Sequence, residues 1–150
     1  MDALRQELAQ ALWRLSEVAF ADWTGQVSEM AQIHGLTLRE INTLYELSVN
    51  ESLKVSAVAA RTGLSKAAAS QMVERMVRQG LLERAENPAN RREKQVRLSP
   101  QGRTITRQFD QAALEQIVKA LSRVPDEKIR PLLGAVNAVL EELEARPPGG

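Results

Sequence analysis

The chain has 150 residues, of which 43% are hydrophobic, and this length is enough for one domain with an ordinary core. It contains no cysteine, which excludes disulfides, thiol catalysis and cysteine-based zinc sites. No apolar run reaches the roughly 18 to 20 residues of a membrane helix, and the first residues lack the layout of a signal peptide. We therefore expect a cytoplasmic protein with no membrane partner.

The net charge of +1 conceals an uneven distribution of charge along the chain. Residues 1–36 carry 2 Lys/Arg and 5 Asp/Glu, residues 37–98 carry 11 and 7, and residues 99–150 carry 7 and 7. The net charges of the three segments are therefore −3, +4 and 0. A basic centre between acidic and neutral flanks suggests that the centre contacts a polyanion.

An amphipathic helix is predicted at the start of the chain, because apolar residues recur at three-and-four spacing from Leu4 to Ala19. The helix can run to about Ile33, and Gly35 then supplies a left-handed stop. Three aromatic residues lie along one broad face, and a histidine near the end can stabilise the helix dipole. Such a stripe is typical of a core or a dimer contact, but it can also form the wall of a ligand pocket. The candidate pocket residues are Trp13, Phe20, Trp23 and His34.

A second helix is predicted to begin after Gly35. Thr37 and Glu40 have the spacing of a capping box, in which each side chain accepts a hydrogen bond from a backbone amide at the helix start. Apolar residues at Ile41, Leu44 and Leu47 give this helix a face to bury.

Residues 55–76 have the pattern of a helix-turn-helix. Ala59 allows two helices to cross closely, Gly63 permits the positive φ of a tight turn, and Ser65 can cap the second helix. A purely structural helical hairpin would share these features. The motif alone therefore leaves both interpretations open.

A β-hairpin is predicted directly after the helix-turn-helix. Gly80 ends the helix, residues 81–86 and 94–98 have the pattern of two strands, and the basic stretch "NPANRRE" lies between them. A charge run by itself is most often solvated surface. A helix-turn-helix followed by a hairpin with a basic tip is, however, the order of elements in a winged helix, and this combination predicts nucleic-acid binding.

Two further helices are predicted after the hairpin. Ser99 and Pro100 are suited to the N-cap and first position of one helix, and Pro125 precedes the other. Pro131 conflicts with a helix that starts at Asp126, so its regular part is expected to begin near Arg130.

The predicted fold is mainly α with a small β-hairpin, in a single domain of residues 1–150. Its winged helix-turn-helix is expected at residues 37–98, between N- and C-terminal dimerisation helices at residues 1–36 and 99–146. Residues 147–150 are expected to be a frayed tail.

Three motifs resemble those of the MarR family of bacterial transcription regulators: "HGLTLREINTLYEL", "VAARTGLSKAAASQMVERMVRQGLLER" and "NRREKQVRLSPQGR". The resemblance covers nearly the whole chain. It implies a homodimer that binds a pseudo-palindromic operator in double-stranded DNA, often as a repressor released by a small-molecule effector; no cofactor is expected. The wing motif departs from the family at Asn90, where an aspartate usually precedes the wing arginine, here Arg92. Because asparagine offers only a neutral hydrogen bond, we expect a mobile wing tip without DNA.

The second helix of the helix-turn-helix is expected to enter the major groove with its N-terminal residues first. A glutamine can pair with adenine, a serine can bond several bases, and an alanine can touch a thymine methyl. The expected base contacts are Ala67, Ala68, Ser70 and Gln71.

Basic side chains around this helix are expected to bind the DNA backbone or the minor groove. Lys66 and Arg75 are assigned to phosphate, and Arg92, with Arg91 beside it, to a narrow A·T-rich minor groove. Further candidate phosphate contacts are Arg39, Lys54, Arg84, Lys94 and Arg97.

A different function class stays open for the same fold. A winged helix can also serve in protein–protein assembly, with the basic surface binding an acidic partner. An enzyme is not expected, because the sequence has one histidine, no Gly-rich phosphate loop and no spaced metal ligands.

Overall fold

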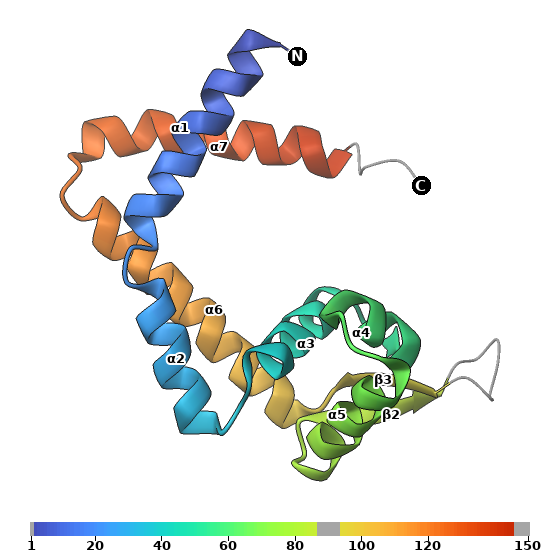
Figure 1. The fold of residues 1–150 in the computed structure, drawn as a ribbon. Coiled ribbons are helices and arrows are strands. Elements are labelled where there is room, and N and C mark those ends of the chain that lie inside the picture. The colour runs from blue at the N-terminus through green and yellow to red at the C-terminus, as the bar shows by residue number, and fades with distance from the viewer. Residues whose placement is uncertain (1, 87–93, 146–150) are drawn as a thin grey trace. The chain divides into compact units, whose positions relative to one another are not determined.

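The computed structural model describes residues 2–86 and 94–145, and these residues are mainly helical (Figure 1). A small antiparallel sheet accompanies the helices, so the predicted fold class is confirmed. In chain order the elements are α1 (Ala3–Ala19), α2 (Trp23–His34), α3 (Leu38–Val49), β1 (Leu53–Lys54), α4 (Val55–Thr62), α5 (Lys66–Arg78), β2 (Leu82–Glu86), β3 (Lys94–Leu98), α6 (Pro100–Leu121) and α7 (Asp126–Ala145).

The described residues form two compact units. The winged-helix unit, residues 21–114, contains α2 to α5, the sheet and most of α6. The terminal unit, made of the described residues before 21 and after 114, contains α1, α7 and the end of α6.

The predicted single N-terminal helix is in fact two helices. α1 ends at Ala19, and α2 begins at Trp23. The backbone of Asp22 has φ −99° and ψ 6°, outside the regular helix, and its carbonyl accepts the first bond of α2 from Gln26 N at 3.3 Å. The expectation of one aromatic stripe was therefore wrong, because it assumed a continuous helix through Phe20.

The start of α3 is as predicted. Gly35 ends α2 with φ 63°, and Thr37 and Glu40 form the complete capping box. Thr37 N donates to Glu40 Oε2 at 2.8 Å, and Glu40 N donates to Thr37 Oγ1 at 3.3 Å. The side chain of Glu40 is buried together with Leu44 and Leu47.

The helix-turn-helix is also as predicted. α4 ends at Gly63, whose φ of 66° is a conformation that side chains with a Cβ rarely adopt. Ser65 then caps α5, because its Oγ accepts a bond from Ala68 N at 3.1 Å. The residues that hold the two helices on the core are Val58, Ala59, Ala69, Met72, Val73 and Met76.

The hairpin strands pair in the predicted antiparallel arrangement, from Leu82 opposite Leu98 to Glu86 opposite Lys94. β1, which was not predicted, pairs with the other edge of β3, with Leu53 opposite Val96. Two residues are too few for alternating hydrophobicity to reveal a strand. The segment 87–93, which includes Asn90 and the expected mobile wing tip, lies outside the described residues.

α6 begins in close contact with the turn that follows α5. Ser99 Oγ donates to the carbonyl of Gly80 at 2.5 Å and accepts from Gly102 N at 2.9 Å, while Ser99 N donates to the carbonyl of Leu81 at 3.1 Å. A Cβ at position 102 would lie 2.2 Å from the carbonyl oxygen of Leu81. This approach requires glycine, and it joins the start of α6 to the winged helix.

The last helix starts earlier than predicted. α7 begins at Asp126 and contains Pro131. The carbonyl of Pro125 accepts bonds from Lys128 N at 2.9 Å and Ile129 N at 3.3 Å, so the first turn is formed before the proline is reached. Pro131 lacks one helical bond and crowds the carbonyl of residue 127, but α7 continues through it, so the prediction gave these effects too much weight.

None of the helices among residues 2–86 and 94–145 is long and apolar enough to cross a membrane.

Candidate nucleic-acid interface

α5 has one face in the core and one face exposed. Its buried residues alternate with exposed small and polar residues in its N-terminal half. Ala67, Ser70 and Gln71 are exposed at spacings of three and four, which places them on one face of the helix, and Ala68 beside them is half-buried. The four predicted base-contact residues are thus next to one another, on a helix whose opposite face is anchored.

Two of the predicted phosphate contacts lie close to the N-terminal ends of helices. Lys66 is the first residue of α5, and Arg39 lies in the first turn of α3; both side chains are exposed. Together with Gln71 and Arg75, Arg39 lines a surface hollow of about 280 Å³ between these helices. The positive ends of the helix dipoles add to the charge of these residues.

Arg75 forms an ion pair with a buried carboxylate, which the sequence did not reveal. Its Nε and Nη2 donate to Oε1 of Glu40 at 3.0 and 2.8 Å. The Glu40 side chain is only 1% exposed, whereas that of Arg75 is 49% exposed. The carboxylate therefore lies in the interior, while the side chain of Arg75 is half exposed.

The pKa of the Glu40 carboxyl reflects opposing influences. Burial raises this pKa, but the hydrogen bonds from the amide and hydroxyl of Thr37 and the bond and charge of Arg75 lower it, and the net result is a pKa below the usual value. Glu40 is consequently ionised at neutral pH, and the pair with Arg75 is a true ion pair.

The other predicted phosphate contacts lie on or beside the sheet. Arg84 pairs with Glu74, and Arg97 pairs with Glu83 at 3.2 Å. The exposed Lys54 lies opposite Gln95, and Lys94 begins β3 opposite Glu86. The predicted minor-groove residues Arg91 and Arg92 lie outside the described residues.

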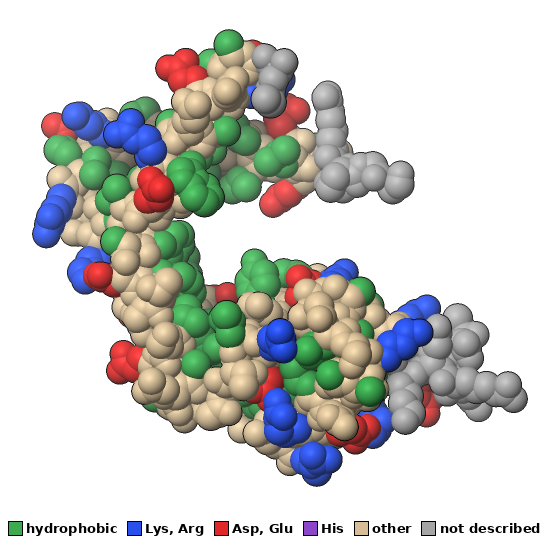
Figure 2. Space-filling model, in the orientation of Figure 1, with side chains coloured by type: hydrophobic (Ala, Val, Ile, Leu, Met, Phe, Trp, Pro, Cys, Tyr) green, Lys and Arg blue, Asp and Glu red, His purple; other side chains and the backbone are tan. Residues whose placement is uncertain are grey.

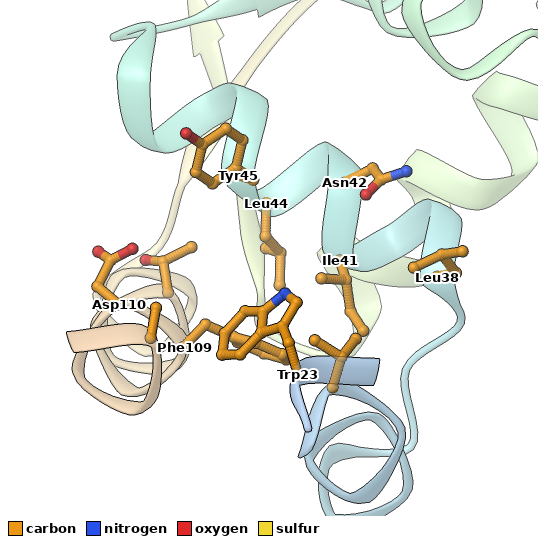
Figure 3. A pocket seen from close by; sticks show the side chains of 11 residues that line it. Trp23, Leu38, Ile41, Asn42, Leu44, Tyr45, Phe109 and Asp110 are labelled. Carbon is orange, nitrogen blue, oxygen red and sulfur yellow. The ribbon is translucent and has the colours of Figure 1, made fainter. Parts of the chain in front are cut away.

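A pocket of about 290 Å³ lies beside α3, within the winged-helix unit. α2, α3 and α6 each contribute to its lining, which is mostly apolar. Figure 3 shows side chains from all three helices around this space, with the carboxylate of Asp110 and the hydroxyl of Tyr45 at one side. The labelled lining residues are Trp23, Leu38, Ile41, Asn42, Leu44, Tyr45, Phe109 and Asp110.

The structure does not bring the four predicted ligand-pocket residues into one pocket. Trp23 lines the pocket just described, Phe20 lines an apolar groove of about 370 Å³ in the terminal unit, and Trp13 lines a third hollow on α1. His34 is half-buried in the last turn of α2, where it adds a basic group near the helix end. Sequence reasoning missed Asp110, because no pattern joins it to Trp23.

The terminal unit exposes a large apolar surface. Figure 2 shows hydrophobic side chains over α1 and α7, with Lys and Arg side chains among them. Many apolar residues of α1 and α7 are more than two-fifths exposed: Leu4, Leu8, Leu12, Trp13, Leu15, Val18, Leu132, Leu133, Val136, Val139, Leu140 and Leu143. Patches of this kind commonly mark protein–protein contacts.

The helix-turn-helix and the strands that follow it define a winged helix-turn-helix protein. Residues 34–93 match the sequence model of the MarR family. The resemblance to this family that the sequence predicts is thus confirmed. The match covers α3, β1, the helix-turn-helix and β2, and it ends before β3. No curated protein sequence matches the chain.

Solved structures with the same fold cover nearly the whole chain. The transcriptional regulator Tm0710 from Thermotoga maritima is 16% identical, with a TM-score of 0.68 over 95% of this chain and 94% of that protein. AbsC, a MarR family transcriptional regulator from Streptomyces coelicolor, is 21% identical, with a TM-score of 0.54 over 97% and 98%. MepR from S. aureus, in a DNA complex, is 16% identical, with a TM-score of 0.65 over 82% and 93%. The chain therefore has the fold of MarR-family transcriptional regulators.

Proposed function

We propose that this protein is a cytoplasmic, sequence-specific DNA-binding transcription regulator. The observation that carries the proposal is the recognition helix α5, which exposes Ala67, Ser70 and Gln71 while its other face is fixed in the core. The hairpin that follows α5 and the basic residues around it are the other parts of a DNA-binding winged helix. The DNA complex of the structural relative MepR supports the same assignment.

The proposal includes a homodimer formed through residues 1–36 and 99–146. Its support is the apolar surface of α1 and α7, which is too extensive to suit a monomer in water. A two-fold dimer presents two recognition helices, and it binds two half-sites that are related by the same symmetry. A pseudo-palindromic operator is therefore part of the proposal.

The proposal also includes repression that a small molecule relieves. Its support is the pocket around Trp23, whose lining is apolar except for a few polar groups and includes one carboxylic acid, Asp110. An apolar molecule that carries a positive charge matches this lining, because the carboxylate would pair with the cation. The pocket lies against α3, which also contributes Glu40 to the ion pair with Arg75 of α5.

Selection from a random-sequence library of DNA duplexes tests the DNA-binding function. The wild-type protein is expected to enrich a pseudo-palindrome and to bind it at least about a thousandfold more tightly than a scrambled duplex of the same composition. Weak binding of both duplexes at physiological salt would contradict the proposal and favour protein–protein assembly instead.

The effector proposal is tested on the selected duplex. Tetraphenylphosphonium, an apolar cation, is expected to release the DNA and to quench Trp23 fluorescence in a Trp13→Phe variant. The oppositely charged tetraphenylborate has a similar shape and serves as the control. Equal effects of both ions, or an unchanged response in an Asp110→Asn variant, would contradict the role of the carboxylate.

A further inference from the structure

The recognition helix carries an arginine that is held from inside the protein. We propose that Arg75 binds a phosphate of the DNA backbone and that the buried carboxylate of Glu40 is the positioning residue that fixes its guanidinium for this contact. The inference rests on the proposed DNA-binding function, and it assigns a role to a residue that cannot itself reach DNA.

The two oxygens of Glu40 have separate partners. Oε2 accepts bonds from the amide and the hydroxyl of Thr37 at 2.8 and 2.7 Å. Oε1 accepts both bonds from Arg75. One carboxylate thereby ties the first turn of α3 to the recognition helix, and its accepting capacity is fully used, which is the condition under which a buried charge is stable.

The geometry of Arg75 leaves part of its guanidinium for another partner. Both bonds to Glu40 use Nε and Nη2, so Nη1 takes part in neither. The side chain is half exposed, and it lines the surface hollow of about 280 Å³ together with Arg39 and Gln71. A phosphate in this hollow would meet two guanidinium groups beside a predicted base-contact residue.

The other ion pairs of the winged-helix unit differ in one respect. Their carboxylates are more exposed: Glu46, which pairs with Arg61, is 37% exposed. Glu74, which pairs with Arg84, is 42% exposed, and Glu83, which pairs with Arg97, is 41% exposed. Water screens such pairs, and both partners can move away from each other. Because Glu40 is buried and held by Thr37, its carboxylate is fixed in place, and so is the guanidinium of Arg75 that is bonded to it. The side chain of Arg75 has therefore already lost, on folding, the conformational entropy that a phosphate contact would otherwise remove.

The salt dependence of DNA binding shows whether Glu40 positions Arg75 for a phosphate or only neutralises the charge of Arg75. The probes are the selected duplex and a mixed-sequence duplex of equal length, titrated at several KCl concentrations. Arg75→Gln is expected to lower the slope of log Kd against log salt by about 0.9, the value for one phosphate contact. Glu40→Gln is expected to weaken binding by about two- to tenfold with an unchanged slope, because the charge of Arg75 remains but its position is no longer fixed.

The double variant distinguishes positioning from a general effect on folding. If Glu40 acts through Arg75, Glu40→Gln has no further effect on DNA affinity when Arg75 is already glutamine. The matched control is Glu46→Gln, which removes an exposed ion pair between α3 and α4 and is expected to leave affinity within about twofold of wild type.

Two outcomes would overturn the inference. Tighter binding by Glu40→Gln would mean that the carboxylate masks Arg75, and an unchanged slope in Arg75→Gln would mean that this arginine contacts no phosphate. If the library yields no preferred sequence, the proposed regulatory function fails, but the slopes on the mixed-sequence duplex still decide the roles of Arg75 and Glu40.

Discussion

Gly102 and Leu81 approach each other so closely that a Cβ on the glycine would lie 2.2 Å from the leucine carbonyl oxygen. The obstructing atom belongs to the backbone, which cannot turn aside as a side chain can. We predict that Gly102→Ala destabilises the protein by about 1 to 3 kcal/mol or more, the usual cost of overpacking. Urea unfolding at fixed protein concentration measures this change.

Gly25→Ala is the matched control for this prediction. Gly25 lies within α2, and a Cβ built on it meets no atom within 4 Å apart from its chain neighbours and the backbone of its own helix. Alanine is the better helix former by about 0.5 to 1 kcal/mol, so this variant is expected to be more stable than wild type. If both substitutions stabilise the protein, the start of α6 does not pack on the turn as described.

The pKa of Glu40 predicts how its contribution to stability depends on pH. Its pKa is lowered in the folded protein, so the unfolded chain binds more protons in the acidic range. The stabilisation by ionised Glu40 is therefore complete above the pKa of about 4.3 that a glutamate has in the unfolded chain. It is lost as the pH falls through the lower pKa of Glu40 in the folded protein. We expect Glu40→Gln to cost about 1 to 3 kcal/mol at pH 7 and less at pH 3. Denaturant unfolding of both proteins at each pH checks this, and an equal difference at both would refute it.

Gln71 and Lys66 are expected to affect DNA binding in different ways. Gln71→Ala should remove the preference for adenine at one position of the operator, at a cost of about 1 to 3 kcal/mol for the preferred base. Lys66→Ala should weaken binding to all sequences alike and reduce the salt slope by about 0.9. Fluorescence anisotropy with single-base variants of the selected duplex measures both. Uniform losses in both proteins would contradict the assignment of Gln71 to a base.

The dimer is tested by a charge on the apolar surface of α7. Light scattering is expected to give twice the chain mass of 16.6 kDa for the wild type at micromolar concentration. Val139→Glu buries a carboxylate in the proposed interface, and we expect it to weaken the dimer by about 2 kcal/mol or more. The control is Val49→Glu, because Val49 is also exposed but lies at the end of α3. A monomeric wild type, or equal effects of both substitutions, would contradict the interface.

Features set by neighbouring residues were predictable from the sequence. The capping box of Thr37 and Glu40, the turn at Gly63 and the cap at Ser65 each depend on side chains within four positions of one another. The winged helix followed from their order along the chain.

Features set by distant residues were not predictable. Glu40 and Arg75 are 35 positions apart, so Arg75 could be read only as one more surface cation. The pocket around Trp23 is built by three helices, and β1 is a strand only because it pairs with β3. The connection between α1 and α2, residues 20–22, contains no glycine or proline, and its sequence is compatible with a helix.

The alternation of exposed and buried alanines on α5 has a consequence for evolution. Ala67 is exposed, whereas Ala69 is completely buried. A larger side chain at position 67 therefore extends the proposed DNA-contacting face without disturbing the core, while any larger residue at position 69 does disturb the core. On the proposed function, a copy of this protein that arises by gene duplication would acquire a new operator through position 67 while its fold is preserved.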